Sequence, residues 1–535
     1  MTLRLPVFPI SHSEEKSEKL NDVLIGIFGA KEPKHEKSEA DFHASSGPVS
    51  ASLDRASGAI YAADNKHQWK VGKERPKLVS AKDAYTRAGE LLHRLKLMPQ
   101  FDDRAPFAVT ELIPGSTLVA TRSKGRREHH ALDVQARYAV GVRNPGVDGQ
   151  PDLLPIVGGG GKFNVAFGHE GRPVGYSGVW RQAGDAEMAE AIDEREAKER
   201  FRKLTSHLEV SDVRSFLAYY AAPSGSKQKM LTPVWVVGGT LHVGRRKVPM
   251  RLVTLPATEY GPKLPEYKPQ PPRKRQPGRL DLDAPSRRGE VIAHSANPFE
   301  AGTSWIGTSG GLAGSHDNAK GFVDGLAADG WLVNFNWGDA NAWESDWRRN
   351  DDTWVDAADF VFYTGHANKD LWVLSSPDDG SLTYNEVGTG PETAGDLWGQ
   401  QDLEWAIIAA CGPLQDNVIS GGGGDVLSRW DGAFDGLHSL MGYGSITYDN
   451  TDEGKKVVQY AKQGTPIIDS WFRAAREIQP STNGASPPDG PDVWVGAMYV
   501  IAGSANPRND HVWGHGSVSA DPHNPNTLVC MWTTC

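Results

Sequence analysis

Two uninterrupted apolar runs most constrain how the C-terminal part of this chain can fold. They read DFVFYT at residues 359–364 and WAIIAA at residues 405–410. A strand with no polar face must be covered on both sides, and such strands are typical of parallel sheets flanked by helices. We therefore predict an α/β fold for residues 291–535.

Strand-like and helix-like patterns alternate through the rest of this region. Helices are predicted where apolar residues recur at helical spacing, from Phe322, Val426, Val457 and Ile467 onward. The last of these helices has Thr465 as candidate N-cap and Pro466 at its first position. Strands are predicted at residues 304–308, 331–337, 359–364, 405–410, 439–446 and 493–503.

The N-terminal part has a different pattern, in which each predicted helix is associated with antiparallel strands, and we predict an α+β region of two loosely repeated units there. One helix begins at Ser80, a candidate N-cap, and a second is predicted at residues 186–204. Strands are predicted at residues 52–64, 136–142, 162–167, 174–180, 215–221, 233–237 and 248–254. The predicted divisions are a flexible segment at 1–45, α+β units at 46–182 and 183–262, a linker at 263–290 and the α/β domain at 291–535.

The linker is rich in proline and strongly basic, and its sequence from residue 263 to 288 reads KLPEYKPQPPRKRQPGRLDLDAPSRR. With almost no large apolar side chain, it is predicted to be extended and exposed. The chain has no run of about 18 apolar residues and no secretory leader pattern, so we expect a cytoplasmic protein with no membrane partner.

Charge divides unevenly along the chain. Residues 291–535 carry 11 Lys and Arg against 32 Asp and Glu, a formal charge of −21, which leaves +11 for the first 290 residues of a chain whose total is −10. Opposite charges predict an intramolecular contact between the basic N-terminal region and the acidic C-terminal domain. The basic residues are scattered and follow no groove-reading motif, so no nucleic-acid partner is expected.

Two reactive side chains follow the apolar strands directly. His366 comes two residues after the first strand and Cys411 comes directly after the second run. Successive parallel strands end at the same edge of a sheet, where open α/β sheets bind ligands. A thiol and an imidazole in one cleft are the minimum for nucleophilic catalysis, and small residues at Gly365, Ala367 and Gly412 would let backbone N–H groups hold an oxyanion.

An apolar strand ending in Gly-His, followed by another ending in Ala-Cys, resembles the caspase-like cysteine peptidases, the group of caspases, legumain, gingipains, clostripain and separase. The residues concerned are FVFYTGH and AIIAAC, and the resemblance covers residues 295–505. The blocks FNWGDANAWESDW and GAFDGLHSLMGYG also resemble a poorly characterised microbial family with the same His and Cys arrangement.

This resemblance implies a caspase-like α/β/α sandwich, with Cys411 as nucleophile, His366 as general acid or base, a peptide or protein substrate and no cofactor. One departure concerns the oxyanion site, because in that group a glycine usually follows the histidine, whereas here Gly365 precedes it and Ala367 follows. Members that cut after Arg or Lys line their pocket with a carboxylate, for which Asp416, Asp425 and Asp449 are the candidates.

A basic preference would make the linker arginines self-processing sites, and the protein a zymogen whose N-terminal region covers the catalytic domain until the linker is cut. The candidate cleavage sites are Arg273, Arg275, Arg279, Arg287 and Arg288.

Two alternatives stay open. In the first, the α/β domain is a non-catalytic interaction protein in which Cys411 is merely packed. In the second, the C-terminal tail holds Zn²⁺ in a metal-dependent hydrolase. Cys530 and Cys535 are also a candidate disulfide pair. The candidate tail ligands are Asp510, His511, His515, Asp521 and His523.

Overall fold

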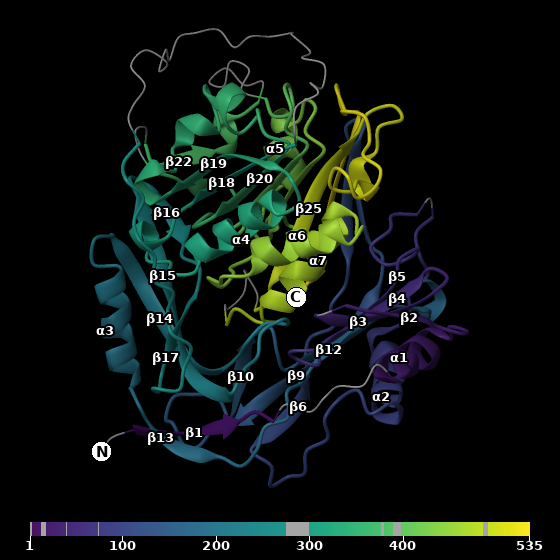
Figure 1. The fold of residues 1–535 in the computed structure, drawn as a ribbon, viewed down its shortest axis with the longest axis vertical. Coiled ribbons are helices and arrows are strands. Elements are labelled where there is room, and N and C mark those ends of the chain that lie inside the picture. Colours follow the sequence, from purple (N-terminus) through teal and green to yellow (C-terminus); the bar gives the residue numbers. More distant parts are fainter. Residues whose placement is uncertain are drawn as a thin grey trace.

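The protein has a mixed α/β fold built on two large β-sheets, which we describe from a computed structural model (Figure 1). The residues that the structure describes are 3–11, 18–38, 40–72, 74–273, 299–375, 379–388, 397–484 and 491–535.

The sheet of the C-terminal part, called here the C-terminal sheet, has a parallel half and an antiparallel half. Its parallel strands contain the apolar runs that the sequence predicted, and all five residues of β20 and of β23 are buried. In order across the sheet, the strands are β19 (Leu332–Gly338), β18 (Glu300–Trp305), β20 (Phe360–Thr364), β23 (Trp405–Ala409), β24 (Ser439–Tyr443), β25 (Trp494–Ile501), β26 (Thr527–Thr534), β7 (Leu118–Ser123) and β8 (Arg126–Ala131).

Helices α4 (Ser315–Ala327), α6 (Glu453–Lys462) and α7 (Ile467–Ile478) cover one face of this sheet (Figure 1). Their apolar stripes pack on sheet residues such as Phe360 and Trp405. The other face is covered by the short helix α5 (Val426–Trp430), the hairpin of β21 (Leu371–Val373) and β22 (Ser381–Thr383), and a cluster of buried tryptophans. That cluster contains Trp347, Trp372, Trp398 and Trp430.

The second large sheet, called here the N-terminal sheet, is packed against helices α1 (Glu18–Phe28), α2 (Ala81–Arg94) and α3 (Glu194–Leu204). In order, its strands are β13 (Glu187–Ala191), β1 (Leu3–Pro9), β15 (Met230–Val243), β14 (Val210–Ala221), β10 (Leu153–Gly158), β9 (Val134–Arg143), β11 (Lys162–Phe167), β12 (Pro173–Val179), β5 (Ile60–Asp64), β4 (Val49–Asp54), β3 (Asp41–Ser46) and β2 (Lys34–Lys37). The strands β16 (Arg246–Pro249) and β17 (Val253–Pro256) pair with β15, and β6 (Phe107–Glu111) pairs with β9.

Short 3₁₀ helices complete the described secondary structure. They are η1 (His169–Gly171), η2 (Thr308–Gly310), η3 (Asp339–Asn341), η4 (Glu344–Asp346), η5 (Asp351–Thr353), η6 (Tyr384–Glu386), η7 (Asp431–Ala433) and η8 (Pro507–Asn509).

The domain divisions expected from the sequence need correction at three places. The first 45 residues, expected to be flexible, include β1, α1 and β2. The two α+β units form one continuous sheet, because β10 pairs in parallel with β14 across the expected division. The helix expected at 186–204 begins only at Glu194, because the residues before it form β13 and pair with β1.

The N-terminal region also contributes two strands to the C-terminal sheet. The β7–β8 hairpin lies within the expected unit 46–182, yet β7 pairs antiparallel with β26 over six residue pairs, from Leu118↔Trp532 to Ser123↔Thr527. In Figure 1 these blue strands run beside the yellow C-terminal strands. The hairpin covers what would otherwise be an exposed sheet edge with unpaired backbone groups.

The beginning of the expected linker packs against the C-terminal part. The guanidinium of Arg273 lies 4.0 Å from the ring centre of Trp343 and 4.2 Å from that of Trp337, and it forms an ion pair with Asp346. Arg273 is therefore held in an aromatic site and is not an exposed cleavage site. The other candidate cleavage sites, Arg275, Arg279, Arg287 and Arg288, lie outside the described residues.

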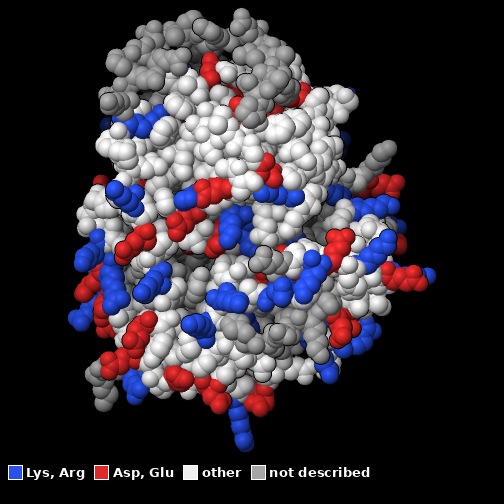
Figure 2. Space-filling view, in the orientation of Figure 1, with Lys and Arg blue, Asp and Glu red and all other residues white. Residues whose placement is uncertain are grey.

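On the face shown in Figure 2, Lys and Arg side chains are interspersed with Asp and Glu over the N-terminal elements. Among the described residues, no helix combines the length and apolar character needed to cross a membrane.

The pairing of β7 with β26 predicts that cutting the linker will not separate the two parts. In a variant whose residues 280–286 are replaced by a specific protease site, we expect the two fragments to co-elute after complete cleavage, because the backbone hydrogen bonds between β7 and β26 remain. Size-exclusion chromatography with mass spectrometry measures this, with uncut protein as control. Elution of two separate fragments without denaturant would contradict the shared sheet.

Candidate active site

The two strands that carry the candidate catalytic residues lie side by side and in register. Strand β20 pairs in parallel with β23 from Phe360↔Trp405 to Thr364↔Ala409. The same offset of 45 positions continues to His366 and Cys411, so both residues leave the carboxyl edge of the sheet at equivalent positions. This is the placement that the sequence predicted.

His366 is completely buried, and both of its ring nitrogens have backbone partners. The backbone N–H of Arg251 donates to Nδ1 at 3.1 Å, and Nε2 lies 2.8 Å from the carbonyl oxygen of Gly310. Because a backbone N–H can only donate, Nδ1 accepts and the proton is on Nε2. The pKa of His366 is lowered to about 4, mainly by burial. The hydrogen bond to the carbonyl of Gly310 raises this pKa, and the positive charge of Arg251 lowers it further.

Cys411 is also completely buried. Its Sγ accepts a hydrogen bond from the backbone N–H of Thr447 at 3.4 Å and lies 3.7 Å from the Thr447 hydroxyl. Burial raises the pKa of the Cys411 thiol, while the contacts with Thr447 and the charge of Arg251 lower it. The side chain packs in a small apolar cluster with Leu252 and Val236. No hydrogen bond joins Cys411 to His366 in the part of the chain that the structure describes.

A segment of the N-terminal region covers both residues. Residues 250–252, called here the covering segment, lie between β16 and β17. The N–H of Leu252 donates to Thr447 O at 2.8 Å, and the N–H of Asp449 donates to Leu252 O at 2.9 Å. The covering segment therefore adds to the loop after β24 as an extended peptide adds to a sheet edge.

The side chain of Arg251 enters the C-terminal part at the ends of β20 and β23. Its Nη1 donates to Thr364 Oγ1 at 2.7 Å and to Ala409 O at 2.8 Å, and its Nη2 donates to Tyr448 O. Nη2 also forms a 3.2 Å ion pair with Glu453, and neither side chain is exposed to solvent. The guanidinium thus occupies the edge of the sheet where the sequence predicted a substrate cleft.

Glu453 is surrounded by other donors as well. Its carboxylate accepts hydrogen bonds from Tyr443 Oη at 2.6 Å, Gln479 Nε2 at 2.6 Å and Asn318 Nδ2 at 3.0 Å. A buried carboxylate needs such compensation, because its desolvation costs several kcal/mol. Arg251 and Glu453 were both missed by the sequence reasoning. The only signal for Arg251 is a lone cation in the apolar run VPMRLV.

Of the three carboxylates proposed for substrate binding, only Asp449 lies beside the covering segment. Its side chain accepts from Gly314 N at 2.7 Å, and burial raises its pKa to about 6. Asp416 and Asp425 instead form ion pairs with Arg127 of β8, at 2.6 and 2.7 Å, and Asp425 caps α5. These two carboxylates therefore hold the N-terminal hairpin, and their expected role in substrate binding stays a prediction.

The small residues near the pair have structural reasons for their size. A Cβ at Gly365 would lie 2.2 Å from Tyr363 Oη, and Gly412 has a φ of +78°, in the left-handed region. Ala367 is buried and forms an isolated bridge with Trp372. A role of these three backbones in holding an oxyanion stays a prediction.

The histidines of the C-terminal tail have separate partners. His515 lies 2.7 Å from Asp329, and His523 lies 3.3 Å from Asp435. His511 Nδ1 lies 3.3 Å from Ser517 O, while Asp510 and Asp521 both contact His438. Among the described residues, the one group of potential ligands close enough to hold a metal lies elsewhere, at Glu300, Asp359 and Asp402. This arrangement does not favour the zinc hydrolase alternative.

The comparisons with known proteins leave the activity open. Residues 296–534, less than half of the chain, match the model of a family described as a domain of unknown function, DUF6345. No curated protein matches the chain. One similar solved structure is an uncharacterized protein from Eubacterium rectale ATCC 33656, with 13% sequence identity, a TM-score of 0.27, and coverage of 50% of this chain and 87% of that chain.

The burial of all three cysteines as free thiols predicts their reactivity. We expect a thiol reagent such as Ellman's reagent to detect no thiol in the folded protein at pH 7 and three after unfolding in guanidinium without reductant. Burial keeps the reagent from the thiols and disfavours the reactive thiolate form. Detection of only one thiol after unfolding would instead indicate a disulfide, for which Cys530 and Cys535 are the candidate pair.

The low pKa of His366 predicts a pH dependence of stability. In the unfolded chain the imidazole of His366 has a pKa near 6.5 and is protonated below that pH. In the folded protein the same imidazole stays neutral until the pH approaches 4. As the pH falls from 6.5 to 4, His366 should therefore remove about 3 kcal/mol from the free energy of unfolding. Denaturant unfolding across this range should show a shallower loss in His366→Gln than in wild type. Parallel curves would contradict a buried neutral imidazole.

Proposed function

We propose that the protein is a cysteine peptidase or related acyl-transfer enzyme of the caspase-like type, in which the covering segment occupies the substrate position and keeps the enzyme inactive. The observation that carries this proposal is that Arg251 contacts the ends of both strands that lead to His366 and Cys411. Its backbone N–H donates to His366 Nδ1, and its guanidinium donates to Thr364 at the end of β20 and to Ala409 at the end of β23. A peptide that follows the covering segment would thus lie across the two strand ends.

The orientation of His366 supports a role as general base. Its Nε2–H is held by the carbonyl of Gly310, so Nδ1 is the nitrogen left to accept a proton once Arg251 N–H moves away. This carbonyl takes the place of the third group that orients the base in catalytic triads. Departure of the covering segment would also expose Cys411, and the loss of its burial would favour the thiolate.

In the proposed reaction, Cys411 Sγ loses its proton to His366 and attacks the carbonyl carbon of a peptide bond. The new S–C bond forms as the C–N bond breaks, and His366 gives its proton to the leaving amine. Water, or an amine in a ligase, then attacks the thioester carbonyl and releases the thiol. The proton that the attacking group gives up returns to Cys411 through His366.

The surroundings of the Arg251 guanidinium support a substrate with arginine. One carboxylate, from Glu453, and three further oxygens, from Thr364, Ala409 and Tyr448, match the planar donors of a guanidinium. The compact ammonium of a lysine would leave several of these buried acceptors without a donor, which is costly. We therefore expect preference for Arg over Lys at this position.

A second candidate function follows from the burial of Cys411. Its packing against Leu252 and its hydrogen bond from Thr447 N favour a non-catalytic interaction protein in which the thiol is inert. In that case Arg251 is a structural residue that joins the two sheets. The two functions differ in what happens when the covering segment is weakened.

The test is the variant Arg251→Ala, in which Glu453 keeps three neutral donors. Loss of the ion pair should weaken docking of the covering segment by about 3 kcal/mol, which corresponds to a ~100-fold larger exposed fraction of Cys411. We expect iodoacetamide labelling of Cys411 to accelerate accordingly, and the variant to turn over an Arg-terminated peptide reporter. Mass spectrometry and fluorescence measure the two effects.

Three controls complete this experiment. Arg251→Ala combined with Cys411→Ala should have no turnover, and Arg251→Lys should restore part of the protection of Cys411. If Arg251→Ala does not fold, Leu252→Ala weakens the same segment without removing the charge. A folded opened variant that labels quickly at Cys411 but turns over no reporter of any type would favour the non-catalytic interaction protein.

A further inference from the structure

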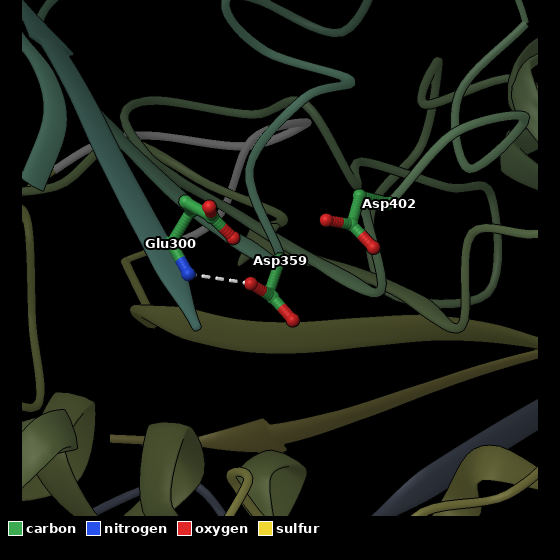
Figure 3. Close-up of side chains that lie close together, drawn as sticks. All are labelled: Glu300, Asp359 and Asp402. Carbon is green, nitrogen blue, oxygen red and sulfur yellow. Dashed lines mark hydrogen bonds between the residues drawn. The ribbon is translucent and has the colours of Figure 1, made fainter. Parts of the chain in front are cut away.

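A cluster of carboxylates lies at the amino edge of the C-terminal sheet, at the opposite end of the strands from His366 and Cys411. Glu300 is the first residue of β18, Asp359 directly precedes β20, and Asp402 lies shortly before β23. One oxygen from each of the three carboxylates lies within 4.8 Å of the others. Figure 3 shows the three side chains close together, Glu300 at the start of its strand and Asp359 and Asp402 on the connecting segments.

This arrangement brings three acidic side chains together, and Asp359 among them is buried. Asp359 is 4% exposed and accepts a hydrogen bond from the backbone N–H of Glu300. In the part of the chain that the structure describes, no Lys, Arg or His forms an ion pair with Asp359. Among these residues, the Asp359 carboxylate has a backbone donor but no cationic partner.

A fourth carboxylate provides an independent observation. Glu404 is 2% exposed, and its Oε2 has no hydrogen-bond partner among the residues that the structure describes. Its N–H donates to Asp359 O at 3.1 Å, and the register Phe360↔Trp405 places Asp359 and Glu404 opposite each other on adjoining strands. Their side chains therefore leave the same face of the sheet. A buried oxygen without a donor beside three converging carboxylates is what a missing cation would explain.

The donor set selects the kind of cation. All of the ligand atoms are carboxylate oxygens, which suit Ca²⁺ and Mg²⁺ better than Zn²⁺. Mg²⁺ usually keeps several waters and is held by one or two carboxylates, whereas Ca²⁺ takes about six to eight oxygen ligands in a flexible geometry. Three carboxylates within 4.8 Å of one another, with a fourth beside them, therefore favour Ca²⁺.

We propose that Glu300, Asp359 and Asp402, with Glu404 beside them, form a binding site for Ca²⁺. The bound ion would tie together the amino ends of β18, β20 and β23. Two of these strands carry His366 and Cys411 at their other ends, but the binding of Ca²⁺ does not depend on whether these residues are catalytic.

Isothermal titration calorimetry of the chelator-treated full chain with CaCl₂ and MgCl₂ at pH 7.5 tests this site. We expect Ca²⁺ to bind at one site per chain and more tightly than Mg²⁺, and to raise the thermal unfolding midpoint. Asp359→Asn should weaken Ca²⁺ binding at least about tenfold, because it removes a buried carboxylate ligand. Glu187→Gln, on strand β13 of the N-terminal sheet, removes a carboxylate far from the site and should bind like wild type.

Glu404→Gln provides a second variant with a smaller change, and it should also weaken binding. Absence of Ca²⁺ binding by wild type would overturn the proposal, as would equal binding by wild type, Asp359→Asn and Glu404→Gln. In that event the cluster is a set of carboxyl groups that share protons. Tighter binding of Mg²⁺ than of Ca²⁺ would overturn the assignment of the ion.

Discussion

The buried ion pair between Arg251 and Glu453 is the interaction on which the arrangement of the two sheets depends. One partner comes from the N-terminal region and the other from the start of α6, and both are fully buried. Neither charge could be buried alone, since the cost of desolvation exceeds what hydrogen bonds from neutral groups return. The C-terminal sheet therefore acquires its observed edge only with the N-terminal region in place, and the division of the chain into separate domains is weaker than its sequence suggests.

Local patterns identified most strands near the site, because burial on both faces leaves a local signature. The runs at β20 and β23 were predicted almost to the residue, and so was the placement of His366 and Cys411 at their ends. The partner of a distant strand has no such signature. No strand was predicted at β7, whose sequence LVATRS does not alternate, and nothing in it indicates pairing with β26, about 400 residues later. Either sheet would satisfy its backbone hydrogen bonds.

The uneven distribution of charge along the chain did not identify which residues pair across the two regions. The sequence indicated that basic N-terminal residues meet acidic C-terminal ones, and ion pairs such as Arg127–Asp416 and Arg251–Glu453 do join the two regions. Asp416 and Asp425 were chosen as substrate ligands for their nearness to Cys411 along the chain. The fold instead brings Glu453, 42 positions beyond Cys411, to the guanidinium, because α6 packs across the sheet from the loop after β24. Nearness in sequence does not measure distance at a sheet edge.

The same contacts limit how the proposed enzyme is activated. Cutting the linker would leave β7 paired with β26 and Arg251 bonded to four groups of the C-terminal part. The cut only increases the conformational entropy of the linker, and the free energy of this term grows slowly with loop length. Release of the covering segment requires a competitor that supplies Glu453, Thr364 and the two carbonyls with equivalent donors. A peptide with an arginine side chain has these donors, and so the substrate itself is the ligand best suited to displace the covering segment. Under the proposed function, activation and substrate recognition would therefore use the same site.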